Sequence, residues 1–278
     1  MRFVKMHGTG NDFVMVDARS ESAPNWSRLA VAMCDRHFGA GSDGLILIEG
    51  DAESGFKMIM YNPDGSEAEM CGNGIRCFAR YLFERNEIAA EKVTVETGAG
   101  PRWIRVDDPA PSSFMVSVGM GTPDFTPSNV PVNLPGNRIV DHPLRVDGLD
   151  LRITALSVGN PHAVAFVEDV TQVPLERIGP MVETNSAFPQ KVNFEICQVT
   201  GDNSLRMRVW ERGAGITLAC GTGASATTAA AVATGRARPG AIDLQVDGGV
   251  LRMRWEGEGS EIVMTGPAEA VYEGRWLL

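Results

Sequence analysis

The feature that most constrains this chain is a Cys-Gly-x-Gly segment that occurs twice, each time where an extended segment gives way to a helix. In the first copy, the apolar residues 58–61 lead into the turn-forming sequence Asn-Pro-Asp-Gly, and Cys71-Gly72-Asn73-Gly74 follows. From position 75 to 83 apolar residues recur at helical spacing, so a helix is predicted to begin directly after Cys71. Free backbone amides and the positive end of the helix dipole stabilise a thiolate at such a position and lower its pKa.

In the second copy, Cys220-Gly221-Thr222-Gly223 precedes the Ala-rich residues 225–233, which have high helix propensity. The repetition predicts two related halves, residues 1–118 with Cys71 and residues 119–265 with Cys220. Residues 119–143 contain five prolines and no clear period, which is typical of a crossing between halves. Two helix starts facing each other would hold two activatable thiols around one anion, for which a carboxylate is the natural guest.

A lone cysteine is more often a small buried side chain than a reactive group, and a Gly-rich bend is often only a turn. Because the whole Cys-Gly-x-Gly segment and its helix occur twice, we interpret Cys71 and Cys220 as a reactive pair. The remaining cysteines, Cys34, Cys77 and Cys197, are assigned to packing.

Composition excludes several classes of function. The chain has 278 residues, 44% hydrophobic content and a formal net charge of −10, so it can bury a core and is an unsuitable partner for nucleic acid. Neither a signal peptide nor an apolar run of membrane-spanning length is found, which predicts a cytoplasmic protein with reduced thiols and no membrane partner. The histidines and cysteines lack zinc-ligand spacing, and the early Gly-x-Gly runs on as strand, which argues against a dinucleotide site.

The pattern along the chain predicts a fold dominated by strands, with one or two long helices in each half. Helices are predicted over residues 27–36, with Ser27 or Asn25 as the cap, over 175–183, and after each Cys-Gly-x-Gly segment. Strands are predicted at residues 2–6, 13–16, 45–48, 56–61, 93–95, 103–106, 114–118, 151–156, 163–167, 192–196, 205–210, 243–246, 251–255 and 261–264.

Two thiols on opposite sides of one carbon could invert a stereocentre without a cofactor. One, as thiolate, would remove a proton, and the other, as thiol, would donate one from the opposite face. The α-hydrogen of an amino acid is only weakly acidic, so helix-terminal amides aimed at the α-carboxylate would have to stabilise the developing charge. No segment indicates a pyridoxal site, although composition alone leaves a Schiff-base lysine open.

The motifs resemble those of the diaminopimelate epimerase family. The run from Asn62 to Cys77, with the letters NPDGSEAEMCGNGIRC, closely resembles the first signature of that family, and KMHGTGNDF at residues 5–13 resembles its N-terminal motif. The later motifs are matched in family order by Gly159-Asn160-Pro161-His162, Val192-Asn193-Phe194, Glu211-Arg212-Gly213-Ala214-Gly215 and Ala219-Cys220-Gly221-Thr222-Gly223-Ala224.

The resemblance implies an α/β fold of the α+β type, with two pseudo-symmetric halves that each wrap a mainly antiparallel sheet around a central helix. It implies that a final strand, at about residues 266–278, returns to the first half, and that the active site lies in the cleft. It further implies a cofactor-independent isomerase that interconverts LL- and meso-2,6-diaminopimelate in lysine and peptidoglycan-precursor synthesis, and a homodimer.

Carried over by motif, the resemblance makes Cys71 and Cys220 the catalytic base and acid. It assigns the backbone amides of Gly72, Asn73, Gly221 and Thr222 to the reacting carboxylate. The remaining amino and carboxylate groups of the substrate are assigned to Asn11, Asn62, Asn160, Asn193, Glu211 and Arg212, and the pKa of the thiols to His162 and Glu211. From chemistry alone, Arg212 offers a bidentate fork for a carboxylate and Glu211 a counter-charge for an ammonium.

One departure and two alternatives stand beside this interpretation. Some family members carry glutamine where this chain has Gly44, so no side chain from position 44 is expected to bind substrate. A proline or hydroxyproline racemase would share the fold and the two thiols, but it typically has histidine at the position of Asn73 and needs no distal carboxylate clamp. A non-catalytic relative would keep the fold and lose the thiols, whereas both are retained here.

Overall fold

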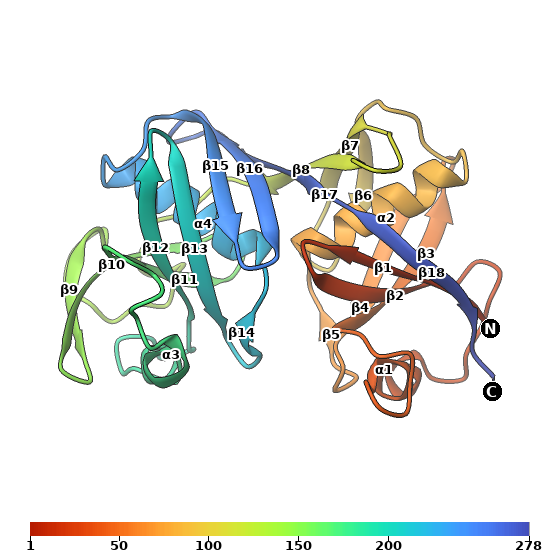
Figure 1. Ribbon diagram of the computed structural model, residues 1–278, viewed down its shortest axis with the longest axis horizontal. Coiled ribbons are helices and arrows are strands. Elements are labelled where there is room, and N and C mark those ends of the chain that lie inside the picture. The colour runs from red at the N-terminus through yellow and green to blue at the C-terminus, as the bar shows by residue number, and fades with distance from the viewer. Residues whose placement is uncertain (278) are drawn as a thin grey trace. The chain divides into compact units, whose positions relative to one another are not determined.

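The computed structural model describes residues 1–277; Leu278, the last residue of the predicted final strand, lies outside the described residues. The chain forms two compact units, one made of Met1–Gly119 with residues 265–277 and the other of Met120–Met264 (Figure 1). It leaves the first unit within β8 (Met115–Gly121) and re-enters it within β17 (Ile262–Pro267).

The first unit is a mainly antiparallel sheet with two helices. Besides β8 it contains β1 (Arg2–Gly8), β2 (Asn11–Asp17), β3 (Gly44–Asp51), β4 (Gly55–Tyr61), β5 (Glu67–Ala68), β6 (Val93–Glu96), β7 (Arg102–Asp108), β18 (Glu269–Arg275), α1 (Trp26–Cys34) and α2 (Gly72–Glu84). The strands pair in the order β18-β1-β2-β3-β4-β6-β7-β8, and β5 adds to β4. Only the β2–β3 and β4–β6 pairs in this series are parallel.

The second unit repeats this plan. It contains β9 (His142–Val146), β10 (Leu149–Ser157), β11 (Pro161–Phe166), β12 (Asn193–Gly201), β13 (Ser204–Glu211), β14 (Gly215–Thr217), β15 (Gly240–Val246), β16 (Gly249–Trp255), α3 (Leu175–Glu183) and α4 (Gly221–Ala233). Its strands pair in the order β9-β10-β11-β12-β13-β15-β16, with β14 on β13, and the parallel pairs are β11–β12 and β13–β15.

The two units therefore share one connectivity, in which β1, β2, β3, β4 and β6 correspond to β10, β11, β12, β13 and β15. In both, a helix follows the second of these strands and a longer helix follows the hairpin after the fourth. The predicted α/β class with two pseudo-symmetric, mainly antiparallel halves is confirmed.

A central helix packs against the strands of the sheet in each unit. Every residue of α2 from position 72 to 82 is buried, and the helix packs against β1, β2, β3, β7 and β18 of its unit (Figure 1). The helix α4 packs against β10, β11, β12, β13, β15 and β16, and its small alanines let the strands approach closely on all sides. The N-termini of these two helices carry the two Cys-Gly-x-Gly segments.

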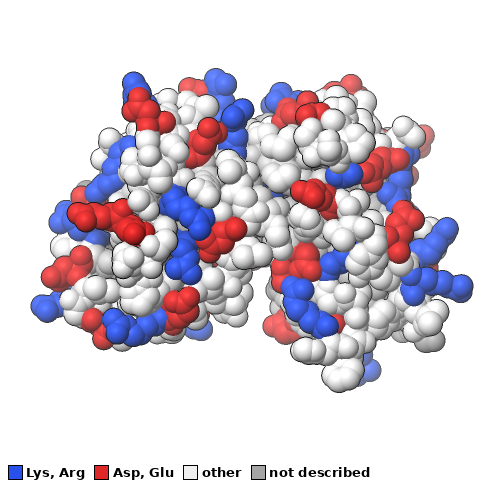
Figure 2. Space-filling model, in the orientation of Figure 1, with Lys and Arg blue, Asp and Glu red and all other residues white. Residues whose placement is uncertain are grey.

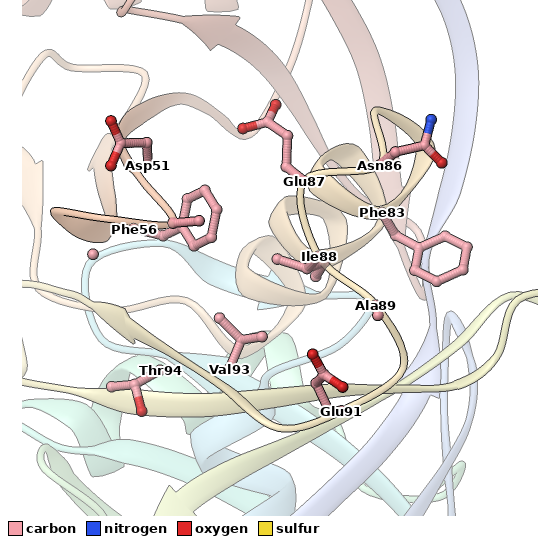
Figure 3. Close-up of a pocket in the computed structure, with 12 residues that line it drawn as sticks. Asp51, Phe56, Phe83, Asn86, Glu87, Ile88, Ala89, Glu91, Val93 and Thr94 are labelled. Carbon is pink, nitrogen blue, oxygen red and sulfur yellow. The ribbon is translucent and has the colours of Figure 1, made fainter.

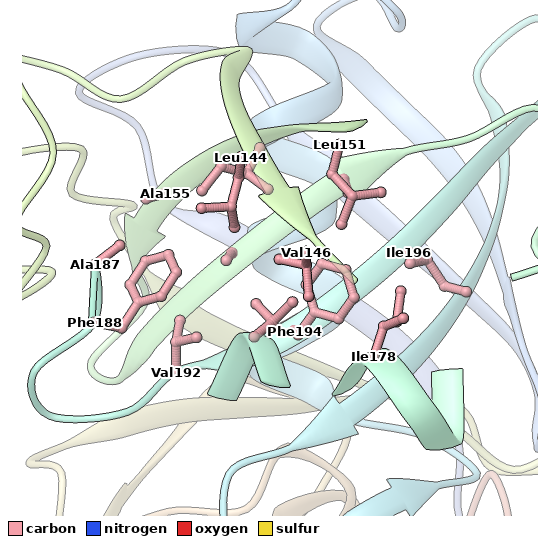
Figure 4. Close-up of a cluster of buried hydrophobic side chains, with 14 of the residues drawn as sticks. Leu144, Val146, Leu151, Ala155, Ile178, Ala187, Phe188, Val192, Phe194 and Ile196 are labelled. Atoms are coloured by element: carbon pink, nitrogen blue, oxygen red, sulfur yellow. The ribbon is translucent and has the colours of Figure 1, made fainter. Parts of the chain in front are cut away.

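A second apolar layer covers the outer face of each sheet. In the second unit, α3 and β9 close over β12, so that Leu144, Val146, Ile178, Phe194 and Ile196 form one buried cluster (Figure 4). In the first unit, α1 covers β2 and β3 through Leu29, Ala30 and Met33. Burying such side chains stabilises each by about 1.5–3 kcal/mol, which fixes the strands that carry the site.

The predicted elements differ from the structure mainly at their ends. Asn25, one of the two proposed caps, is the N-cap of α1, and its Oδ1 accepts from the amide of Arg28 at 2.9 Å. Ser27 instead donates to the carbonyl of Gly65 at 2.6 Å. β9 lies at the end of a proline-rich segment and pairs along one edge with β10, so its short apolar pattern was too weak to predict a strand.

Acidic and basic residues are interspersed over both units on the face shown in Figure 2. Many are paired, as Arg19 is with Asp17 and Glu87. Over residues 1–277, no helix combines the length and the apolar character needed to cross a membrane.

Candidate active site

Cys71 is the N-cap of α2 and has an extended backbone, with φ −135° and ψ 114°. Its Sγ accepts a hydrogen bond from the amide of Gly74 at 3.4 Å. Glycine at position 74 leaves room for the neighbouring strand, because a Cβ there would lie 2.6 Å from Ile46 Cδ1, which would have to move aside. The first-turn amides of α2 are thus directed at the sulfur and at the space beside it, as in an anion site.

Asn11 positions a side-chain amide against this cap. Its Oδ1 lies 3.6 Å from Cys71 Sγ and accepts from Asn73 Nδ2 at 3.1 Å, while its Nδ2 donates to Asp43 Oδ2 at 2.8 Å. Asn73 is buried and also contacts Thr9 Oγ1 at 3.4 Å. The structure therefore brings together Cys71, Asn73 and Asn11, three of the residues predicted for the site.

Arg76 is a fully buried arginine on the same helix, and sequence reasoning missed it. Its guanidinium donates to the carbonyls of Gly72 at 3.2 Å and Pro267 at 3.0 Å and to Thr9 Oγ1 at 3.0 Å. Burial lowers the pKa of Arg76 to about 10, while the neighbouring thiols Cys77 and Cys71 favour its charged form. The side chain is still a cation at neutral pH.

Cys220 repeats the geometry of Cys71 as the N-cap of α4, with φ −126° and ψ 118°. Its Sγ accepts from the amide of Gly223 at 3.4 Å and lies 3.4 Å from Thr222 Oγ1. Asn160 Nδ2 donates to the same Thr222 hydroxyl at 3.3 Å. The structure thus joins Cys220, Thr222 and Asn160, three of the residues assigned to the site.

The surroundings of Cys220 correct one expectation. Burial raises the pKa of the Cys220 thiol well above its usual 9.0, and the carboxylates of Glu211 and Glu195 raise it further. Hydrogen bonds from Thr222 and Gly223 act in the opposite direction but are outweighed. The prediction that a helix start alone lowers the pKa is wrong for Cys220, because the residue is only 6% exposed and its sulfur faces two acidic side chains.

Glu211 lies in this buried region at the end of β13. Its carboxyl accepts hydrogen bonds from Thr217 Oγ1 and from the Cys220 thiol. Burial raises the pKa of Glu211, and these two hydrogen bonds partly offset the effect. Glu211 therefore contacts one of the thiols directly.

His162 and Glu195 form a pair with no exposed side-chain surface. His162 Nδ1 lies 2.7 Å from Glu195 Oε1, and Nε2 lies 2.9 Å from Asn160 Oδ1. Glu195 Oε2 is buried and has no hydrogen-bond partner among the described residues. The sequence carried one sign of this residue, since an acidic side chain two positions after Asn193 on the same strand shares its face.

The other predicted binding residues are placed as follows. Asn193 is buried; its Nδ2 donates to the Pro161 carbonyl and its Oδ1 accepts from the Arg212 amide, both at 2.9 Å. The Arg212 guanidinium donates to the Gln190 carbonyl at 3.1 Å. Asn62 lies in the turn after β4, where its side chain donates to Ser66 Oγ at 3.0 Å, and no described hydrogen bond joins it to Cys71.

Gly44 begins β3 at the position that Asn193 occupies in β12. A Cβ on Gly44 would lie 2.8 Å from Met60 Cε and 3.0 Å from the Tyr61 carbonyl. A side chain here would need the end of Met60 to move aside and the Tyr61 carbonyl to shift slightly, which gives a packing reason for the glycine of this chain.

A cavity of about 670 Å³ lies away from both thiols. It is bordered by the end of α2 and the segment after it, including Phe83, Ile88 and Val93 (Figure 3). Of the acidic groups beside it, Glu87 is paired with Arg19 and Asp51 caps its own turn at Ser54. Its lining contains none of the predicted site residues, so its volume alone does not indicate a reaction.

Comparison with known proteins gives a consistent result across the chain. The family model described as diaminopimelate epimerase matches residues 3–126 and 154–271. A protein from Moorella thermoacetica named diaminopimelate epimerase is 46% identical over 282 residues, covering 100% of both chains. One of the same name from Acetivibrio thermocellus is 45% identical over 274 residues, covering 99% of this chain and 98% of the relative.

Solved structures share the fold at low identity. A Bacillus anthracis phenazine biosynthesis protein of the PhzF family superposes with a TM-score of 0.71 at 18% identity, covering 100% of this chain and 99% of that one. A hydroxyproline epimerase from Agrobacterium vitis, solved with bound trans-4-hydroxy-L-proline, gives a TM-score of 0.71 at 17% identity, with 99% and 90% coverage.

Proposed function

Because the chain belongs to the diaminopimelate epimerase family, we propose that it interconverts LL- and meso-2,6-diaminopimelate for lysine and peptidoglycan-precursor synthesis in the cytoplasm. The observation that carries the proposal is the occurrence of a cysteine N-cap at corresponding places in both units. A pair of thiols, each at the start of a buried helix, is suited to proton transfer at a carbon next to a carboxylate.

In this mechanism, the thiolate of one cysteine removes the α-proton and becomes a thiol. The electron pair left on carbon is delocalised into the α-carboxylate. The thiol of the other cysteine then protonates the opposite face and becomes the thiolate, so the stereocentre is inverted and the two sulfurs have exchanged states. The mechanism requires both sulfurs to reach one carbon, and it needs no cofactor.

The binding roles follow the local geometry. Amides of Gly72, Asn73, Gly221 and Thr222, at the first turns of α2 and α4, are proposed to hold the reacting carboxylate. Asn11 and Asn160 stand beside the caps, and Asn193 fixes the backbone of Arg212. We assign Asn11, Asn62, Asn160, Asn193, Glu211 and Arg212 to the remaining substrate groups, and His162 with Glu211 to the tuning of Cys220. A homodimer belongs to the same proposal.

A proline or hydroxyproline racemase is the nearest alternative. Its support is limited to the shared fold, whereas relatives 42–46% identical over nearly the full chain are named diaminopimelate epimerase. Asn73 is buried and bonded to Asn11, so it is built into the site in the place where those racemases are expected to have histidine. A non-catalytic relative would have no need for two cysteine caps.

Hydrogen exchange tests the proposed activity. The protein is incubated in deuterated water with LL- or meso-diaminopimelate, or with L-proline, and α-deuterium and chirality are followed by mass spectrometry and chiral chromatography. Deuterium uptake and inversion are expected with both diaminopimelate isomers and not with proline. Turnover of proline alone would replace the proposal with the racemase alternative, and turnover of neither substrate would remove the enzymatic assignment.

Arg212→Lys is expected to weaken productive binding, raising KM by about tenfold or more, because the planar fork is lost while the charge remains. The Nη1 contact to the Gln190 carbonyl, which orients the guanidinium, is lost with it. Steady-state kinetics give the readout, with Arg238→Lys as the control because Arg238 is an exposed surface arginine paired with Asp202. An unchanged kcat/KM in Arg212→Lys would show that Arg212 does not contact the substrate.

A further inference from the structure

The shared connectivity of the two units allows their thiol environments to be compared position by position. In β2 and β3, Phe13 is opposite Gly44; in β11 and β12, His162 is opposite Asn193. Two positions further along the second strand of each pair lie Ile46 and Glu195. The equivalence is direct, because a Cβ on Gly74 would meet Ile46 Cδ1 at 2.6 Å and a Cβ on Gly223 would meet Glu195 Oε1 at 2.7 Å.

The strand side chains that lie beneath the starts of the two helices therefore differ in chemistry. Beneath α2 they are the apolar pair Phe13 and Ile46. Beneath α4 they are His162 and Glu195, which are hydrogen-bonded to each other, and one carboxylate oxygen of Glu195 has no hydrogen-bond partner among the described residues.

The two helices also differ in the charge of one buried side chain. Five positions after each cysteine stand Arg76 and Ser225, both buried. Arg76 Nη1 donates to the Gly72 carbonyl at 3.2 Å, and Ser225 Oγ donates to the Gly221 carbonyl at 2.9 Å, so both bond to the first residue of their helix. The first unit thus places a buried cation behind its thiol, where the second unit has a neutral hydroxyl.

The charged groups that approach the two sulfurs differ in sign. Cys220 is approached by Glu211 from β13, by Glu195 from β12 and by the Thr222 hydroxyl of its own helix. His162 from β11 contacts Glu195. Cys71 is approached by Arg76 and Cys77 from α2 and by the Asn11 amide oxygen, to which its thiol donates at 3.6 Å. The Nδ2 group of Asn11 donates in turn to Asp43. The amide oxygen is an uncharged acceptor, so its effect on the thiolate is weaker than that of a buried guanidinium. Cys71 is also more exposed than Cys220, so water can solvate its charge.

We propose that Arg76 and Glu195 are positioning residues that set the two thiols in opposite protonation states before substrate binds, with Cys71 as the thiolate and Cys220 as the thiol. The charge asymmetry stands on the structure alone, while its catalytic consequence rests on the proposed function. In that case the resting enzyme is prepared to abstract the α-proton that faces Cys71. It must take up and release a proton before it accepts the other stereoisomer.

The proposal is tested without substrate, by alkylation of the intact protein with iodoacetamide at a series of pH values. A thiolate sulfur displaces iodide and forms a sulfur–carbon bond, so the pH midpoint of modification at each cysteine reports its ionisation, whatever the plateau rate. Mass spectrometry of peptides reports all five cysteines separately. The midpoint of Cys71 is expected at least about one pH unit below that of Cys220, a tenfold difference in the ratio of thiolate to thiol. Equal or reversed midpoints would overturn the proposal.

Two variants assign the effect to the named residues. Glu195→Gln keeps an oxygen acceptor for His162 and removes the charge, so the midpoint of Cys220 should fall while that of Cys71 stays. Arg76→Gln should raise the midpoint of Cys71, whereas Arg76→Lys, which keeps the charge, should raise it less. Glu183→Gln is the matched control, since Glu183 is a buried carboxylate of the second unit bonded to Trp210 at 2.7 Å, and it should move neither midpoint.

Each outcome bears on a separate claim. If Arg76→Gln does not fold, the wild-type midpoints and the Glu195→Gln variant still test the proposal. An unchanged alkylation midpoint of Cys220 in Glu195→Gln would contradict the role of Glu195. Loss of epimerase activity in the exchange assay would leave the thiol midpoints intact, so failure of the proposed function and failure of this inference are distinguishable.

Discussion

Replacement of Cys71 or Cys220 by serine is expected to lower kcat/KM for epimerisation of diaminopimelate by about a thousandfold or more, within the range assigned to general acid–base catalysis. A serine hydroxyl is far too weak an acid to form the base near neutral pH. As an acid it is also poorer than the thiol it replaces. Each substitution therefore removes one of the two proton transfers that inversion requires.

The two variants should differ in which isomer they still activate. Each keeps one thiol, which can still abstract the proton on its own face, so residual α-hydrogen exchange or β-elimination should persist with one stereoisomer and be weaker with the other. Exchange into deuterated water from LL- and meso-diaminopimelate, measured side by side, gives the preference of each variant. Cys34→Ser is the control, because Cys34 is buried beside Ser42 in the first unit. Near-wild-type epimerisation by either active-site variant would indicate a one-base mechanism.

Much of the fold could be predicted because the pattern of each strand is local. Residues 45–48 form a continuous apolar run, as expected of a strand buried on both faces, and they lie within β3. The predicted range 175–183 is that of α3. What the sequence could not supply is the pairing that gives β9 and β14 their strand conformation, since these short segments become strands only against β10 and β13.

The site was predictable where the chemistry depends on residues near in sequence. Cys71 and Cys220 stand directly before their helices, so their caps follow from the local run of glycines. Glu195 and Arg76 were missed because their roles depend on tertiary placement: an acidic residue in a strand and a basic residue in a helix most often face solvent. The raised pKa of Cys220 has the same origin, since β12 and β13 bring Glu195 and Glu211 to it.

The stability of the fold is expected to fall steeply above pH 9, because four of its thiols are buried as neutral groups. Burial raises the pKa of Cys77 from its usual 9.0 to about 12, and the pKa values of Cys34, Cys197 and Cys220 are raised as well. Above pH 9 these thiols ionise in the unfolded chain and keep their protons in the folded one. The folded state then binds more protons, so the free energy of unfolding decreases as pH rises.

A thiol that keeps its proton in the folded chain up to pH 10 lowers the free energy of unfolding by about 1.4 kcal/mol between pH 8 and pH 10. Cys77, Cys197 and Cys220 together lower it by about 4 kcal/mol, and Cys34 acts in the same direction. This is a large part of the ordinary stability of a globular protein, about 5–15 kcal/mol. This decrease continues to about pH 10. The pKa of Arg76 is lowered to about 10, so above this pH the folded chain loses the Arg76 proton before the unfolded chain does, and this begins to offset the decrease.

Urea unfolding at pH 8 and pH 10 in the presence of a reducing agent measures this decrease. In Cys77→Ala it should shrink by about 1.4 kcal/mol, although a small cavity lowers the stability of the variant at both pH values. Comparing the difference between the two pH values, rather than either stability, separates the proton linkage from the packing loss. An equal decrease in wild type and variant would show that Cys77 ionises as readily in the folded chain as in the unfolded one, in spite of a position within α2 that leaves it no exposed surface.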